Sequence, residues 1–124
     1  PKTAWPPTCS VIGSGVTIEP GAIVRDSIIM SSTTIKAGTV VDKSIIAENV
    51  TVGKDCKLGV GEELPNKVKP DVYAFGLVTI GEDSVIPDGV QIGKNTAIKG
   101  VTEPSDYPDG VLAGGETLIK VGDR

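Results

Sequence analysis

An aliphatic residue returns every five or six positions along most of this chain, and three such steps add up to seventeen residues. A helix repeats every 3.6 residues and a strand every two, so neither element alone has this period. A chain that turns a corner after every short strand does have it, and the spacing predicts a coiled prism. We call these aliphatic residues anchors; they are Ile12, Ile18, Val24, Ile29, Ile35, Val41, Ile46, Val52, Leu58, Ile80, Ile86, Ile92 and Ile98.

The residue two places before each anchor is small or β-branched. Alternate residues of a strand point to the same side, so each anchor and its small partner should both face inward. A narrow, close-packed interior requires this alternation of large and small side chains. Cys56 is one of the partners, and we expect its side chain to pack in the interior instead of acting as a reactive thiol. Cys9 and Cys56 are far apart in the sequence, and we expect two free thiols instead of a disulfide. The partners are Val16, Ala22, Ser27, Thr33, Thr39, Ser44, Val50, Cys56, Val78, Ser84, Val90 and Thr96.

The third residue after most anchors is Gly, Asn or Asp, the residues that most readily adopt a left-handed backbone. These positions predict tight corners with positive φ, and Ser32 is the exception to the residue preference. The two five-residue sides should turn through Arg25-Asp26 and Asp42-Lys43. The remaining corner positions are Gly15, Gly21, Gly38, Asn49, Asp55, Asp83, Gly89 and Asn95. Stacking at seventeen residues also predicts three outer charge pairs, which are Glu19 with Lys36, Arg25 with Asp42, and Asp26 with Lys43.

The pattern divides the chain into three parts. Residues 11–99 should form an all-β prism of about four to five triangular coils, interrupted by a projecting loop at 59–77. Residues 1–10 are Pro-rich and read as a linker, and the chain begins with Pro1, which we interpret as the start of a fragment. Residues 100–124 should form a capping tail, with a short hairpin around Gly114-Gly115.

Composition excludes several classes of function. The net charge of −4 disfavours nucleic acid and anionic membranes as partners, because both select clustered Lys and Arg. No apolar run approaches the roughly 20 residues that span a bilayer, and we expect a cytoplasmic protein. The absence of His leaves no usual general base or zinc ligand, so we expect no catalytic residue, metal or cofactor. The four aromatic residues lie outside the periodic segments, which predicts an interior of aliphatic and small side chains only; they are Trp5, Tyr73, Phe75 and Tyr107.

Two sets of motifs resemble known families. The stretches Ile12-Gly13-Ser14-Gly15-Val16, Val52-Gly53-Lys54-Asp55-Cys56 and Ile92-Gly93-Lys94-Asn95-Thr96 resemble the hexapeptide repeat of left-handed parallel β-helices, which implies the left hand. The features Pro6-Pro7-Thr8, Asp26-Ser27-Ile28-Ile29, Lys43-Ser44-Ile45-Ile46 and Val85-Ile86-Pro87-Asp88-Gly89-Val90-Gln91-Ile92-Gly93 are similar to the C-terminal β-helix domain of glucose-1-phosphate adenylyltransferases.

This second resemblance implies a non-catalytic regulatory and oligomerisation domain. The parent enzyme would join ATP and glucose 1-phosphate to give ADP-glucose and pyrophosphate, in glycogen-type biosynthesis. Implied partners are an N-terminal nucleotidyltransferase domain, further copies of the chain, and a phosphorylated metabolite effector. Lys54 and Lys57 lie in a segment resembling the basic Val-Gly-basic-x-Cys-basic-Leu stretch of this family, so they are the first candidates for binding the effector's anionic group, with Arg25 and Lys36 behind them.

Two alternatives stay open. A stand-alone scaffold would use the loop at 59–77 as its contact, with Tyr73 and Phe75 either anchoring a partner or capping a coil edge. An acyltransferase, a common enzyme on this fold, would have to work without the His that such enzymes use as general base. Because the chain lacks a phosphate loop and metal-binding carboxylate motifs, we expect it to be inactive by itself.

Overall fold

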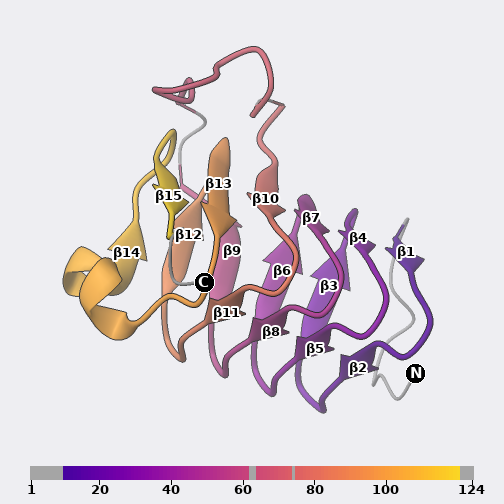
Figure 1. Cartoon of the computed structure of the whole chain (residues 1–124). Coiled ribbons are helices and arrows are strands. Elements are labelled where there is room, and N and C mark those ends of the chain that lie inside the picture. Colours follow the sequence, from indigo (N-terminus) through magenta and orange to yellow (C-terminus); the bar gives the residue numbers. More distant parts are fainter. Residues whose placement is uncertain (1–9, 62–63, 74, 121–124) are drawn as a thin grey trace.

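The chain folds into a parallel β-solenoid with three sheets around one interior (Figure 1). The computed structural model describes residues 10–61, 64–73 and 75–120. The expected linker, with Trp5 and Cys9, falls almost entirely outside these residues. The solenoid has about six turns, so the prism is longer than the four to five coils expected.

Each of the first four turns contributes one strand to each sheet, the later turns add strands to the first and third sheets only, and every pairing is parallel. The first sheet contains β1 (Val11–Ile12), β4 (Ile28–Ile29), β7 (Ser44–Ile46), β10 (Val78–Ile80), β13 (Thr96–Lys99) and β15 (Thr117–Ile119). The second sheet contains β2 (Thr17–Ile18), β5 (Thr34–Ile35), β8 (Thr51–Val52) and β11 (Val85–Ile86). The third sheet contains β3 (Ile23–Arg25), β6 (Val40–Asp42), β9 (Lys57–Val60), β12 (Gln91–Gly93) and β14 (Val111–Leu112).

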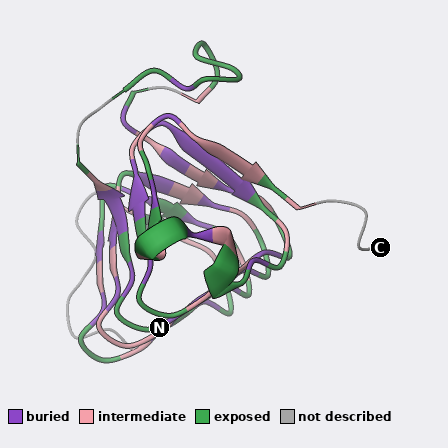
Figure 2. Cartoon of the chain, turned by 90° about the vertical axis from the view of Figure 1, so that its left-hand side faces the viewer, coloured by how far each residue is buried: buried purple, intermediate pink, exposed green. Residues whose placement is uncertain are grey.

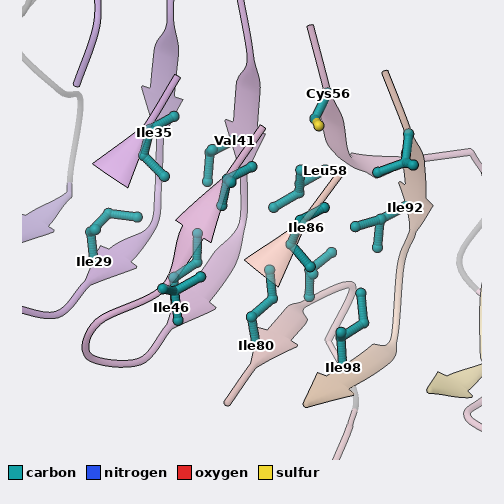
Figure 3. Close-up of a cluster of buried hydrophobic side chains, with 14 of the residues drawn as sticks. Ile29, Ile35, Val41, Ile46, Cys56, Leu58, Ile80, Ile86, Ile92 and Ile98 are labelled. Carbon is teal, nitrogen blue, oxygen red and sulfur yellow. The ribbon is translucent and has the colours of Figure 1, made fainter. Parts of the chain in front are cut away.

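The interior confirms the pairing of large anchors with small partners. Every anchor is buried except Ile12, which is partly buried, and all twelve small partners are buried as well. Figure 3 shows labelled anchors from successive coils, with side chains directed into the same interior. Burying each anchor contributes roughly 1.5–3 kcal/mol through removal of apolar surface from water.

The corners confirm the second pattern. All of the predicted Gly, Asn and Asp positions have positive φ, and so does Ser32, with a φ of 64°. The five-residue sides turn at Asp26 and Lys43, whose φ values are 47° and 48°. A corner that falls every five or six residues therefore sets the triangular cross-section, and the anchors fill it.

The C-terminal tail differs from expectation, because it forms no hairpin. β14 pairs in parallel with β12 in the third sheet, whereas β15 pairs in parallel with β13 in the first sheet. Gly115, with a φ of 82°, is one more prism corner between them. Gly93 explains the close stacking here, because a Cβ on it would lie 2.5 Å from the backbone nitrogen of Gly114. The coils therefore continue beyond residue 99.

The interior is also not purely aliphatic, because Tyr107 closes its C-terminal end. Tyr107 is 2% exposed and lies between two short 3-10 helices, η1 (Pro104–Asp106) and η2 (Pro108–Gly110). Figure 2 shows these turns across the end of the prism that faces the viewer. The Tyr107 hydroxyl lies 2.9 Å from the Thr102 hydroxyl. This bond allows a phenol to enter an otherwise apolar core.

The inserted loop begins later than expected, at residue 61, because β9 extends to Val60. Its base is tied to the last coils by two buried amides, Asn66 and Asn95. The Asn66 side chain donates to the Asn95 carbonyl at 2.8 Å, and the Asn95 side chain donates to the Leu64 carbonyl at 2.8 Å. Lys67 also forms an ion pair with Glu116. The loop thus projects from a firmly attached base.

Candidate functional site

Lys54 and Lys57 lie on either side of one prism corner, where the chain passes from the second sheet to the third. Asp55 turns this corner with a φ of 55°, and the Cys56 side chain points inward at 0% exposure. Because Cys56 and Leu58 are buried, the Lys57 side chain between Leu58 and the corner faces outward and is exposed. The Lys54 N–H donates to Asp88 Oδ1 of the next coil at 2.8 Å, which holds the corner in place.

Lys36 occupies the same corner one coil earlier. Its backbone N–H donates to the Val52 carbonyl at 3.1 Å, which places Lys36 beside Gly53 and therefore one residue from Lys54 in the stack. Strand spacing then puts the Lys36 and Lys54 Cα atoms about 6 Å apart. The predicted pair of Lys36 with Glu19 is wrong, because the Glu19 carboxylate instead accepts the Ala37 N–H at 3.0 Å.

Arg25 lies away from these three lysines, at the opposite edge of the third sheet. The register aligns Ile23 with Val40 and Val40 with Lys57, so Arg25 is two coils and two residues from Lys57. This corresponds to about 12 Å between Cα atoms. Its guanidinium forms the predicted pair with Asp42, with Nη2 and Oδ2 3.7 Å apart.

An exposed pair of this kind contributes about 0–1 kcal/mol, and it leaves Arg25 partly neutralised. The third predicted charge pair is wrong, because no ion pair joins Asp26 and Lys43 in the described residues. Both residues are themselves corners, and the Lys43 N–H donates to the Arg25 carbonyl at 3.1 Å.

Lys36, Lys54 and Lys57 thus belong to the same prism corner on adjacent coils, and Arg25 belongs to a different corner. Within the described residues, none of the three lysines forms an ion pair. Asp55 and Asp88 lie at the same corner and weaken the positive potential there. The arrangement offers the ammonium groups of the exposed Lys54 and Lys57, with that of the half-buried Lys36 beside Lys54, to an anion approaching from solvent.

Cys56 takes no part in this chemistry. Its thiol donates to the Pro87 carbonyl at 3.1 Å, and burial raises the pKa of the thiol above its ordinary value. A thiol that stays protonated is a poor nucleophile and a poor metal ligand. The prediction that Cys56 packs inside the prism is therefore confirmed.

An apolar depression lies beside Lys57, and no sequence pattern predicts it. Lys57 is the register neighbour of Gln91, and Gln91 lines an open depression of about 360 Å³ together with Val60, Leu64 and Val111. A second depression of about 430 Å³ lies next to it and includes Pro108 and Glu116. Their walls come from β9, β12, β14 and the loop, which lie far apart in sequence. No periodic signal marks them.

Neither a metal site nor a membrane-spanning helix is found in the part of the chain that the structure describes. No cluster of three or more acidic or Cys side chains there has the spacing to hold a metal ion. None of its helices combines the length and hydrophobicity needed to cross a bilayer.

Comparison with known proteins gives a consistent result. Residues 7–102 match the family described as GMPPB C-terminal domain. The chain is 59% identical over 114 residues to a glucose-1-phosphate adenylyltransferase of Lachnospira eligens and 43% identical over 114 residues to that of Acetivibrio thermocellus. Each alignment covers 92% of this chain and 27% of the relative.

A glucose-1-phosphate adenylyltransferase of Thermotoga maritima is 48% identical over 110 residues, covering 89% of this chain and 26% of the relative. The chain thus spans about a quarter of the length of these relatives, and it corresponds to their C-terminal part. With more than half of its residues matched, the chain belongs to the GMPPB C-terminal domain family.

Proposed function

We propose that this chain is the regulatory and assembly domain of a glucose-1-phosphate adenylyltransferase. The observation that carries the proposal is the match of 92% of the chain to the C-terminal part of relatives with that name. The whole enzyme would convert ATP and glucose 1-phosphate to ADP-glucose and pyrophosphate. Its reacting groups would belong to an N-terminal nucleotidyltransferase domain, and this domain would need no cofactor of its own.

The regulatory part of the proposal rests on Lys36, Lys54 and Lys57. The ammonium groups of the exposed Lys54 and Lys57 and of the half-buried Lys36, on adjacent coils, can bind the phosphate of a metabolite, because each is a mobile cationic donor. Their backbone positions are set by corner geometry and parallel pairing, so the lysines keep their relative spacing. Arg25 has a lesser role in this proposal, because Asp42 already holds its guanidinium.

Inorganic pyrophosphate is a suitable probe, and chemical-shift titration of the chain is a suitable measurement. We expect shifts centred on residues 36, 54 and 57, and about tenfold weaker binding in Lys54→Ala and Lys57→Ala, which corresponds to about 1.4 kcal/mol. Lys43→Ala is a matched control, since Lys43 is an exposed corner lysine at the other edge of the third sheet. Equal weakening by all three variants would mean non-specific charge attraction and would reject the site.

The same proposal covers assembly and location. A free buried thiol at Cys56 suits a reducing compartment, which supports a cytoplasmic enzyme. Parallel solenoid sheets with exposed outer faces are suited to packing against other copies of the chain or against the catalytic domain. Co-purification of this chain with a separately expressed catalytic domain would test the contact between the two domains. Complete absence of binding would contradict that contact.

A stand-alone interaction module is the second candidate, and the loop is the observation that favours it. Phe75 is 80% exposed, so it does not cap a coil edge, whereas Tyr73 is half-buried. The sequence upstream of Pro1 in the genome decides between the two candidates. An upstream nucleotidyltransferase region supports the first candidate, and a start codon close to Pro1 supports the second.

A further inference from the structure

Two apolar depressions adjoin on the outer surface of the last coils. The first has a volume of about 360 Å³ and the second has a volume of about 430 Å³. Each volume lies within the range of roughly 300–1,000 Å³ that small-molecule sites occupy. Three wall residues belong to both depressions, and we call the two together the joined depression. The shared residues are Val111, Leu112 and Ala113.

An irregularity in β9 shapes one wall of the joined depression. Leu58 of β9 pairs with Ile92 of β12. The next register pair is Val60 with Gly93, so Gly59 is an extra residue in β9. Gly59 has a φ of 89°, which is typical of the glycine in a β-bulge. Bulges redirect nearby side chains and are common next to active sites, and Val60 here becomes part of the wall.

Three glycines leave backbone uncovered in the first depression. Gly61 has a φ of 83°, and Gly93 stacks so closely on Gly114 that a Cβ on Gly93 would lie 2.5 Å from the Gly114 nitrogen. Folding therefore favours glycine at Gly61 and Gly93. A consequence is that no side chain at these positions holds a ligand away, so a flat ring can approach the backbone closely.

The rim of the first depression is cationic on the β9 side. Lys57 is exposed, and it is the register neighbour of Gln91, which lines the first depression. Lys94 directly follows the wall residue Gly93 and is half-buried. Neither lysine forms an ion pair within the described residues. The Gln91 amide adds a neutral hydrogen-bond donor between Lys57 and the apolar wall.

The end of the second depression away from Lys57 is acidic. Glu116 lines this depression and is held in an ion pair with Lys67. Asp109 directly follows the wall residue Pro108 and is exposed. A negatively charged group is therefore attracted at the Lys57 end and repelled by Asp109 at the other end. This difference favours an anionic ligand and gives it one orientation.

The cationic rim and the apolar wall are close enough for one small ligand to contact both. Lys57, Gln91 and Val111 occupy consecutive register positions on β9, β12 and β14, which Figure 1 shows near the C-terminal end of the prism. At the spacing of neighbouring strands, about 10 Å separates the Cα atoms of Lys57 and Val111. The lysine side chain spans part of this distance, and a pair of fused aromatic rings spans the rest.

We propose that the joined depression binds a small amphipathic anion, with its aromatic ring against β12 and β14 and its anionic group at Lys57. The inference goes beyond the proposed function, which assigns a phosphate to the lysines and no apolar contact. The two sites share Lys57 alone. The bulged wall, the uncovered backbone and the charge difference between the two ends all favour this class of ligand.

Fluorescence titration with a charged and a neutral dye tests the anionic part of the ligand. Anilinonaphthalene sulfonate is an amphipathic anion, and phenylnaphthylamine has the same ring system without the sulfonate. Lys57→Ala should weaken binding of the sulfonate about threefold to fivefold and leave binding of the neutral dye unchanged. Equal effects on both dyes, no effect on the sulfonate, or no dye binding to the wild-type chain would each overturn the proposal.

Two substitutions in the shared wall test the apolar part. Val111→Thr should weaken binding of both dyes about threefold, because it replaces an apolar methyl group by a hydroxyl group. Ala113→Asp should weaken binding of the sulfonate at least about tenfold, because it places a carboxylate in the apolar wall. Both positions are exposed, so the fold tolerates the changes. Val72→Thr is the matched control, since Val72 is 64% exposed on the loop and lies outside both depressions.

We expect Val72→Thr to leave the affinity for both dyes unchanged. Equal weakening by Val72→Thr and Val111→Thr would mean that the dyes bind exposed apolar surface in general, and it would reject the site. Lys54→Ala should weaken pyrophosphate binding but not dye binding, whereas Val111→Thr should do the reverse. Failure of the joined depression is therefore distinct from failure of the proposed anion site.

Discussion

The Asn66 side chain donates a hydrogen bond to the Asn95 carbonyl at 2.8 Å and so joins the inserted loop to the corner before β13. Asn66 also accepts the backbone N–H groups of Val68 and Lys69, at 2.8 and 2.9 Å. One buried amide therefore organises the loop and fastens it to the last coils.

Asn66→Ala should destabilise the chain by about 2–4 kcal/mol. The change leaves buried backbone donors and acceptors without partners, and each costs about 1–3 kcal/mol before relaxation. Urea unfolding monitored by circular dichroism gives the free energy. Gln91→Ala is the control, because Gln91 is exposed on β12 and should change stability by less than about 0.5 kcal/mol. Equal effects in the two variants would show that the loop is not fastened through Asn66.

Ile35→Ala should lower the free energy of unfolding by about 2–5 kcal/mol. Ile35 is 0% exposed, and its truncation leaves a cavity between neighbouring coils that rigid corners prevent from closing. Thr34→Ala, on the outward side of the same strand, should cost less than about 1 kcal/mol. Thermal and urea unfolding can both measure the difference. A small effect at Ile35 would mean that the interior repacks freely.

Ser32→Gly should stabilise the chain by about 0.5–1 kcal/mol. Ser32 has a φ of 64°, and a residue with a Cβ pays about 1–2 kcal/mol there, which exceeds the extra chain entropy that Gly brings. Ser31→Gly lacks that strain to relieve and should destabilise instead. Opposite signs for two adjacent serines are the expected result in urea unfolding. Destabilisation by both changes would argue against strain at this corner.

Alkaline pH should weaken the fold through Tyr107. Burial, chiefly, raises the pKa of Tyr107 from 10.0 to about 12. The unfolded chain therefore releases this proton at lower pH than the folded chain does. The stabilising contribution is complete below pH 10 and is lost as the pH rises towards 12.

Tyr107→Phe isolates this effect from other alkaline titrations. The variant loses the hydroxyl contact with Thr102 and should be about 0.5–1.5 kcal/mol less stable at pH 7. The gap between the two proteins should then narrow from pH 10 to 12, as measured by urea unfolding at fixed ionic strength. A constant gap across that range would show that Tyr107 ionises as freely in the folded chain as in the unfolded one.

Local rules predicted the coils well because each rule acts within a few residues. The small partner of Ile35 is Thr33, and the corner that follows is Gly38, so one side of the prism is specified by six consecutive positions. The same rules did not predict the conformation of the C-terminal tail. Residues 111–119 contain two apolar strands around Gly114-Gly115, and a hairpin and a prism corner share that local pattern. Stacking on β12 and β13 decides between them.

The candidate site was only partly predictable, because the repeat fixes which residues are aligned but not which hydrogen bonds their side chains form. A period of seventeen aligns Arg25 with Asp42, and this pair forms. The period also aligns Glu19 with Lys36, but the Glu19 carboxylate accepts a hydrogen bond from the Ala37 backbone N–H instead of pairing with Lys36. Charge positions follow from the register, whereas the choice between competing donors depends on side-chain geometry.

The sequence by itself determined the prism, since large anchor, small partner and left-handed corner recur within every few residues. Tertiary structure alone decided how the prism ends and which surfaces remain open. Tyr107 enters the core only because the last coil lacks a covering coil, and Phe75 stays in solvent because Asn95, nineteen residues from Gly76, holds its segment. Such long-range contacts do not recur at a fixed spacing in the sequence. They stabilise the fold only after the distant segments have been brought together, which costs chain entropy.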